Sequence, residues 1–383
     1  MQPGEIIQRA RETAELEHFH SNSFTDGLEI IVGDLDRSSM LDSAGRAALE
    51  QVYVNLLVQR LRVDDWLMRH PALTERPIER PVVIAGMPRT GTTVASYLLG
   101  ADPARRSLLK WEVWNGVPPA AAGALTTDPR CVAMKQAEED SLASAHAAKH
   151  HEDADGPSEC TFVVAQDFKS MFLEALHPVP SYRDWLLRTD MKSGYDTHKR
   201  LLQVLQANNG GTWNLKMPSH ALFIEDFLEA YPDAKIIWTH RDPYKTMGSL
   251  ISLIHGTHLN FCPGSDTLAY CADHYPRQIS EHVVRMMAAE DKGLLHSGNC
   301  YHLFYHEALA DPLGEMRRIY AWLGDDLTPE IEQHMQAWLN AKPQGHFGKH
   351  EYSLEKQGLS VARLQPYFAE YLARYSIELE GRA

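Results

Sequence analysis

PVVIAGMPRTGTT, residues 81–93, is the stretch that decides the fold. Its first half, PVVIAGM, is an apolar run of the length expected for a fully buried strand. A turn with glycines at Gly86 and Gly91 follows, and helical sequence resumes with VASYLLGAD. In such a turn, backbone N–H groups and the helix N-terminus behind them form a concave site for phosphate oxygens. The stretch therefore predicts an anion site at the end of a buried strand.

Two further runs extend this strand into a sheet. AKIIWTH at 234–240 and NCYHLFYHE at 299–307 also have the composition of strands, and helical patterns separate them. Alternating strands and helices predict an α/β fold, with a central parallel sheet flanked by helices, of the P-loop-containing nucleotide-binding type. Residues 1–78 carry helical periodicity and are expected to form an N-terminal helical extension, with the main domain at 79–383.

Composition excludes several classes of function. The net charge of -14 argues against a protein that coats a nucleic acid or an anionic membrane, because both need a basic surface. Neither nucleic-acid binding nor membrane insertion is expected. The five cysteines form no C-x-x-C pair, which fits a reducing, cytoplasmic setting. His146, His150 and His151 stand near several acids, but no metal site is predicted there.

The cation of the turn argues against nucleoside-triphosphate chemistry. The lysine position of a Walker A loop is occupied by Thr92, and the only cation in the turn, Arg89, stands three positions earlier. Two alternatives nevertheless stay open. One is a P-loop NTPase or small-molecule kinase, and the other is a non-catalytic nucleotide-binding protein on the same fold.

PRTGTT resembles the 5'-phosphosulfate loop, P-[KR]-[ST]-G-T-T, of sulfotransferases that use 3'-phosphoadenosine 5'-phosphosulfate (PAPS). The resemblance implies that Arg89 contacts the phosphosulfate and its bridging oxygen, while Thr90, Gly91, Thr92 and Thr93 hold the 5'-phosphate. Negative charge builds on the phosphate oxygen as the sulfuryl group leaves, and a fixed guanidinium stabilises that charge. A sulfotransferase with PAPS as co-substrate and no metal is therefore expected.

The resemblance extends to the other half of the donor. An arginine at a strand end and a serine eight positions later bind the 3'-phosphate in that family, and Arg241 with Ser249 match this spacing. A guanidinium with a hydroxyl is a sound phosphate clamp. By the same resemblance, Tyr305 lies near the adenine. Lys349 and His350 occupy the place of a late basic loop over the 3'-phosphate.

Two residues are candidates for the general base that takes the proton of the acceptor hydroxyl. Glu112 resembles the glutamate base of tyrosyl-protein and related bacterial members. His220 lies where cytosolic members carry K-x-H, but here it follows Lys216 by four positions instead of two. Lys216 itself matches the lysine near the transferring group. Loss of Arg89 or Lys216 is expected to affect turnover more than donor affinity.

The acceptor is expected to be a small molecule with a hydroxyl group. HHEDADGPSECTF, residues 150–162, resembles a segment that walls the acceptor pocket in bacterial sulfotransferases, which implies that His151 and Glu159 contact the acceptor. Phe168 and neighbouring aromatic residues would add an apolar wall. Such a pocket suits a phenol, an aliphatic alcohol or a lipid-like acceptor. A homodimer is a possible assembly.

Overall fold

The sheet that the sequence predicts forms the centre of the molecule. The computed structural model describes residues 1–141, 153–342 and 353–381. Five parallel strands run in the order β2-β3-β1-β4-β5. The strands are β1 Val82–Gly86, β2 Arg105–Ser107, β3 Thr212–Lys216, β4 Lys235–His240 and β5 Cys300–Phe304. The expected fold class, a parallel sheet flanked by helices, is confirmed.

Three of the five strands were predicted, with one difference in extent. β1 and β4 lie within the apolar runs 81–87 and 234–240. β5 ends at Phe304, earlier than the predicted run, and a helix begins at Tyr305. The residues after Phe304 include Glu, Ala and Leu, which favour helices over strands.

β2 and β3 were missed because they carry buried polar side chains. In β3, Asn214 Nδ2 donates to the carbonyl oxygen of Ser96 at 2.9 Å and to Ser107 Oγ at 3.1 Å. In β2, the Arg106 guanidinium lies over the ring of Trp213, 4.9 Å from its centroid. These partners come from distant parts of the chain, so periodicity along the sequence does not indicate either strand.

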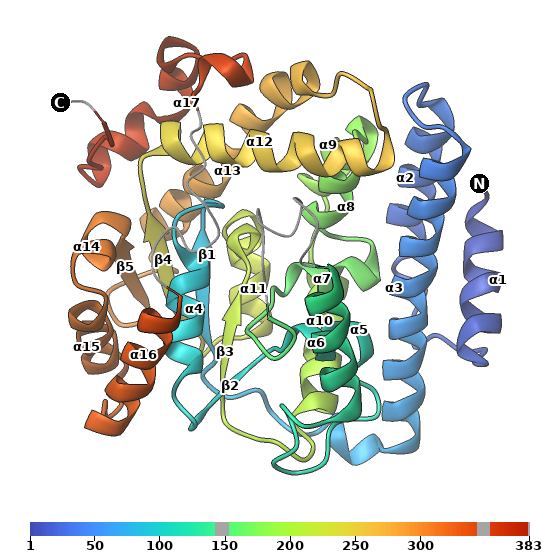
Figure 1. The fold of residues 1–383 in the computed structure, drawn as a ribbon, viewed down its shortest axis with the longest axis horizontal. Helices are drawn as coiled ribbons and strands as arrows, with labels where there is room; N and C mark the ends of the chain where they lie inside the picture. The colour runs from blue at the N-terminus through green and yellow to red at the C-terminus, as the bar shows by residue number, and fades with distance from the viewer. Residues whose placement is uncertain (142–152, 343–352, 382–383) are drawn as a thin grey trace.

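Helices cover both faces of the sheet (Figure 1). α1, α2 and α3 stand along one side of the molecule, and α14, α15 and α16 stand along the other. The α-helices are α1 Pro3–Ala14, α2 Thr25–Arg37, α3 Ser43–Arg69, α4 Thr92–Gly100, α5 Lys110–Asn115, α6 Pro129–Ser141, α7 Thr161–Val164, α8 Met171–Leu176, α9 Pro180–Leu186, α10 Lys192–Leu205, α11 Ile224–Ala230, α12 Pro243–Phe261, α13 Leu268–Asp291, α14 Tyr305–Ala310, α15 Pro312–Leu323, α16 Pro329–Ala341 and α17 Val361–Arg374. The 3-10 helices are η1 Pro71–Leu73, η2 Ala165–Asp167, η3 Pro218–Phe223 and η4 Glu355–Gln357. Within these ranges no helix is both long enough and apolar enough to cross a membrane.

The central strand β1 is buried on both faces. Val83 and Ala85 pack into a large core that also contains apolar residues of α1, α2 and α3. Val82 and Ile84 face a smaller core that they share with α4, α15 and α16. Alternate side chains of a strand point to opposite faces, so an apolar residue at every position is what two covering layers require.

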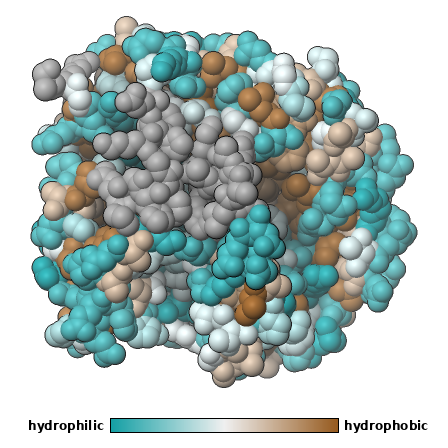
Figure 2. All heavy atoms as spheres, viewed as in Figure 1, coloured by the Kyte–Doolittle hydropathy of each residue, from teal (hydrophilic) through white to brown (hydrophobic). Residues whose placement is uncertain are grey.

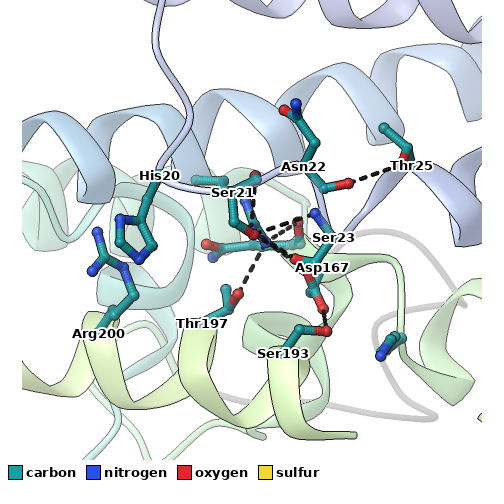
Figure 3. A network of polar contacts seen from close by, with 12 residues as sticks. His20, Ser21, Asn22, Ser23, Thr25, Asp167, Ser193, Thr197 and Arg200 are labelled. Carbon is teal, nitrogen blue, oxygen red and sulfur yellow. Dashed lines mark hydrogen bonds and ion pairs between the residues drawn. The ribbon is translucent and has the colours of Figure 1, made fainter. Parts of the chain in front are cut away.

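A buried polar network joins the N-terminal helices to the rest of the chain (Figure 3). Arg60 of α3 donates through Nη1 to Asp167 Oδ1 at 2.7 Å and to Thr197 Oγ1 at 2.9 Å. Its Nη2 donates to Ser23 Oγ at 3.0 Å. Asp167 also accepts a hydrogen bond from Ser193 Oγ at 2.6 Å. The network therefore links α3 and the segment before α2 to η2 and α10.

Candidate active site

A cavity of about 510 Å³ lies where the strands end. Part of its polar lining comes from segments that follow β1, β3, β4 and β5, because parallel strands place their carboxyl ends at one edge of the sheet. Helices α8, α12 and α13 supply an apolar wall. Figure 2 shows a mostly hydrophilic face on which hydrophobic side chains gather around a hollow near its centre. The volume is in the range of small-molecule sites.

The turn after β1 has the backbone conformation of an anion-binding loop. Arg89 has φ 67° and Gly91 has φ 88°, both in the left-handed region. The positive φ favours glycine at position 91, and a Cβ there would also crowd Tyr305, whose Cδ2 would lie 3.0 Å away. Thr92 and Thr93 line the cavity and begin α4. The helix N-terminus thus points its free N–H groups toward the cavity.

The side chain of Thr90 bonds to other parts of the protein, whereas Thr92 and Thr93 line the cavity. The Thr90 hydroxyl donates to the carbonyl oxygen of Met87 at 2.7 Å and shares a hydrogen bond of 2.6 Å with Thr239 Oγ1. The side chain is buried and fastens the turn to β4. The hydroxyl of Thr90 is therefore engaged within the protein, and Thr90 is absent from the cavity lining, so its expected contact with the 5'-phosphate stays a prediction for its backbone N–H group.

The residues predicted for the two ends of the donor are connected. Arg89 Nε donates to Ser249 Oγ at 3.1 Å, and Arg241 Nη1 donates to the carbonyl oxygen of Arg89 at 2.9 Å. The Arg241 guanidinium lies over the Tyr305 ring, 3.8 Å from its centroid. Residues more than 200 positions apart in the sequence are thus brought to one side of the cavity.

Glu380 is a partner of Arg241 that the sequence did not indicate. Its two carboxylate oxygens accept hydrogen bonds from Arg241 Nε at 2.6 Å and Nη2 at 2.9 Å. Its backbone N–H donates to Asp242 Oδ2 at 2.8 Å. A smaller cavity next to this pair is lined by residues 377–380 together with Tyr305. No motif in the sequence signals a carboxylate so far from Arg241.

Lys216 and Glu159 form an ion pair in which Glu159 lines the cavity and Lys216 lies behind it. Lys216 ends β3 and is fully buried, and its Nζ lies 3.3 Å from Glu159 Oε1. Glu159 lines the cavity, as its predicted role as an acceptor contact requires. The backbone N–H of Cys160 donates to the carbonyl oxygen of Lys216 at 2.9 Å, which holds the two segments together.

Neither predicted base lines the cavity. Glu112 is buried in α5, forms an ion pair with Arg106, and accepts a hydrogen bond from the Leu109 N–H at 3.3 Å. Burial raises the pKa of Glu112 although Arg106 opposes this shift. His220 is buried in η3, where its Nδ1 lies 3.0 Å from the hydroxyl of Tyr195, and burial moves the pKa of His220 well below its usual value.

One residue predicted for the cavity lies elsewhere, and one residue that lines the cavity was not predicted. Phe168 lies in the core, with its ring 5.6 Å from that of Tyr53, and does not line the cavity. His282 of α13 does line the cavity, although it was not predicted. Its Nδ1 lies 3.3 Å from the carbonyl oxygen of Gln278. One histidine within a long helix gives no signal that separates a core position from a site position.

Three predicted site residues lie outside the described ranges. They are His151, Lys349 and His350. The histidines at 146 and 150 also fall there. In the part of the chain that the structure describes, no three or more His, Cys, Asp or Glu residues are grouped as metal ligands.

Comparison with known proteins identifies the family to which the chain belongs. The profile of the sulfotransferase family matches residues 81–329, which include both arginine motifs. The chain belongs to the sulfotransferase family. This confirms the resemblance and the expected reaction class, which is the transfer of a sulfuryl group by an enzyme.

Individual relatives agree with this assignment. The crystal structure of sulfotransferase STF9 from Mycobacterium avium superposes with a TM-score of 0.92 at 41% identity, covering 99% of this chain and 98% of that one. STF1 from Mycobacterium tuberculosis H37Rv gives 0.84 at 28% identity, covering 96% and 98%. The omega-hydroxy-beta-dihydromenaquinone-9 sulfotransferase Stf3 of Mycobacterium bovis is 26% identical over 276 residues, 67% of this chain and 66% of the relative. At 99% coverage, the superposition on STF9 includes the N-terminal helices.

Proposed function

We propose that this sulfotransferase uses PAPS as its donor and transfers the sulfuryl group to the hydroxyl of a small apolar acceptor. The observation that carries the proposal is the hydrogen-bonded chain Ser249–Arg89–Arg241 beside the cavity. PAPS carries phosphate groups on both the 3'- and the 5'-oxygen of its ribose, and this chain places two guanidinium groups and a hydroxyl together, next to the aromatic ring of Tyr305. The residues present fit such a donor.

The proposed reaction is a direct displacement at sulfur. PAPS supplies an activated sulfuryl group whose departure leaves 3',5'-ADP. Arg89 stabilises the negative charge that develops on the oxygen the sulfur leaves, and the buried ammonium of Lys216 stabilises the sulfuryl oxygens. Thr92, Thr93 and the N-terminus of α4 hold the 5'-phosphate. The rate of transfer thus depends on the positioning of the reactants and on fixed positive charges, and no metal is assigned a role.

The acceptor is proposed to be lipid-like or phenolic. Phe162, Met171, Phe172, Leu250 and Ile254 form much of the cavity wall. An apolar wall with few polar groups binds an apolar body and orients one hydroxyl. The name of the relative Stf3 refers to a hydroxylated menaquinone, which supports an alcohol on a lipid-like skeleton.

Several finer expectations remain part of the proposal. We propose that Tyr305 contacts the adenine, and that Lys349 and His350, which lie outside the described residues, contact the 3'-phosphate. The five cysteines are free and buried, which supports a reducing, cytoplasmic compartment. The homodimer stays a prediction that solution mass would test.

Two measurements test the proposal. Calorimetry is expected to show that 3',5'-ADP binds and that ATP does not compete with it at similar concentration. Labelled sulfate should then pass from PAPS to members of a panel of phenols and long-chain alcohols. Absence of 3',5'-ADP binding contradicts the donor assignment, whereas donor binding without transfer across the panel favours a non-catalytic nucleotide-binding protein.

A further inference from the structure

We infer that Glu159 is the general base that takes the proton from the acceptor hydroxyl. The inference rests on the proposed function and assigns a catalytic residue within the same cavity. Among the described residues that line the cavity, Glu159 is the only carboxylic acid. Its side chain is 17% exposed, so an acceptor that enters the cavity can reach it.

The backbone on both sides of Glu159 is fixed. The N–H of Ser158 donates to the carbonyl oxygen of Leu108 at 2.7 Å, just after β2. The N–H of Cys160 donates to the carbonyl oxygen of Lys216 at 2.9 Å, at the end of β3. The backbone of Glu159 is therefore held between the carboxyl ends of two neighbouring strands, and the ion pair with Lys216 orients its carboxylate.

Lys216 places this carboxylate beside the phosphate loop. Lys216 pairs in register with Ile84 of β1, and the N–H of Met217 donates to the carbonyl oxygen of Ile84 at 3.2 Å. The ammonium thus lies at the strand end next to the one that carries Arg89. Since Glu159 Oε1 is 3.3 Å from Lys216 Nζ, the base lies next to the cation assigned to the sulfuryl group.

The step balances without any further reactant. The acceptor oxygen forms a bond to sulfur while the bond between sulfur and the bridging phosphate oxygen breaks. The electron pair of that bond goes to 3',5'-ADP, whose new charge Arg89 stabilises. The hydroxyl proton goes to a carboxylate oxygen of Glu159, which later releases it to water.

The other proton acceptors are less well placed. Glu112 is paired with Arg106, and His220 is enclosed beside Tyr195; neither lines the cavity. His282 does line the cavity, but burial lowers its pKa to about 3, so its imidazole holds a proton poorly.

Glu159→Gln tests the inference, because glutamine keeps an oxygen that can accept a hydrogen bond from Lys216 but cannot take a proton. For an aliphatic alcohol we expect kcat to fall by about 100-fold or more, the range typical of a lost general base. For a strongly acidic nitrophenol, ionised before it binds, we expect a fall of less than about tenfold. Binding of 3',5'-ADP should change little. Matched variants Glu112→Gln and His282→Gln are expected to lack this dependence on acceptor acidity.

Each outcome decides between explanations. An equal loss of kcat with alcohol and nitrophenol acceptors would overturn the base assignment and leave Glu159 as a residue that positions Lys216. Wild-type kcat with the alcohol in Glu159→Gln would also overturn it. Neither result affects the proposed function, which fails only if the wild-type protein does not bind 3',5'-ADP or transfer sulfate from PAPS.

Discussion

At the scale of single residues, Arg89 combines an unusual backbone with a central position in the polar chain. Its φ of 67° turns the side chain toward Ser249 while its carbonyl oxygen accepts the hydrogen bond from Arg241. The left-handed conformation costs energy for a residue with a Cβ. The loop therefore holds Arg89 in place through contacts on both its side chain and its backbone.

Arg89→Met is expected to lower kcat by about 100- to 1000-fold, the loss typical when one stabilising donor is removed. Methionine retains much of the apolar length of the side chain but neither the charge nor the N–H donors that reach Ser249 and the leaving oxygen. Affinity for 3',5'-ADP, measured by calorimetry, should fall by less than about tenfold, because that product no longer carries the sulfuryl group. Ser249→Ala is the control, and it should affect 3',5'-ADP affinity more than kcat. Equal losses of kcat and affinity in Arg89→Met would contradict the assigned role.

Glu174, in the cavity-lining helix α8, makes the free energy of unfolding depend on pH. It is fully buried and accepts a hydrogen bond from Gln278 Nε2 at 2.6 Å. Burial raises the pKa of Glu174 from 4.5 to about 7. The carboxyl of Glu174 therefore loses its proton at lower pH in the unfolded chain than in the folded chain. As a result, the contribution of Glu174 to the free energy of unfolding falls as the pH rises from about 4.5 to about 7.

Glu174→Gln should remove that dependence. Relative to wild type, we expect the free energy of unfolding of the variant to rise by about 2 to 3 kcal/mol between pH 5 and pH 8. Urea unfolding at several pH values provides the measurement. Buried histidines such as His198, whose pKa burial lowers to about 3, act in the opposite direction, so the difference between the two proteins is the readout. A pH-independent difference would show that Glu174 does not titrate in this range.

At the scale of elements, residues 377–380 pack against the end of β4 and occupy the clamp proposed for the 3'-phosphate. Glu380 presents two oxygens to Arg241, as a phosphate would. A donor that binds Arg241 must exchange with this carboxylate. Glu380→Gln is therefore expected to tighten 3',5'-ADP binding by up to about fivefold, since partly exposed ion pairs contribute about 1 kcal/mol or less.

Glu378→Gln is the matched control for this prediction. Glu378 lies in the same segment and lines the smaller cavity, so its substitution changes the local charge by the same amount. Calorimetry on both variants separates the pair with Arg241 from general charge repulsion. Equal affinities in the two variants would show that charge alone, and not the exchange at Arg241, sets donor affinity.

The same elements show which parts of the site the sequence could predict. The turn after β1 and the Arg241–Ser249 spacing are local patterns, and each lies directly after a strand of apolar residues. Glu112 and Glu159 are both acids next to family-like motifs, and only their partners distinguish them. Arg106 holds Glu112 in the interior, whereas Lys216 holds Glu159 at the cavity. Local sequence patterns do not show which distant segments pair. The choice between Glu112 and Glu159 as the base therefore could be made only from the folded structure.

At the scale of the whole molecule, the N-terminal helices are part of the enzyme's core. Apolar residues of α1, α2 and α3 belong to the same cluster as those that cover one face of the sheet. The network of Arg60 and Asp167 fixes η2 (Figure 3), which stands between the two cavity-lining helices α7 and α8. We therefore propose that residues 1–78 form an extension that folds together with residues 79–383 and supports the acceptor wall.

Arg60→Met tests this cooperation. The substitution leaves the fully buried carboxylate of Asp167 without its cation, and removing one partner of a buried ion pair costs about 3 to 5 kcal/mol. The double variant with Asp167→Asn should lose less than the sum of the two single variants, because the unpaired charge is gone. Arg9→Gln, which breaks a partly exposed pair with Glu50 in the same helices, should cost less than about 1 kcal/mol. Denaturant unfolding is expected to show one transition in every case. A separate early transition in Arg60→Met would mean that the N-terminal helices unfold independently of the sheet.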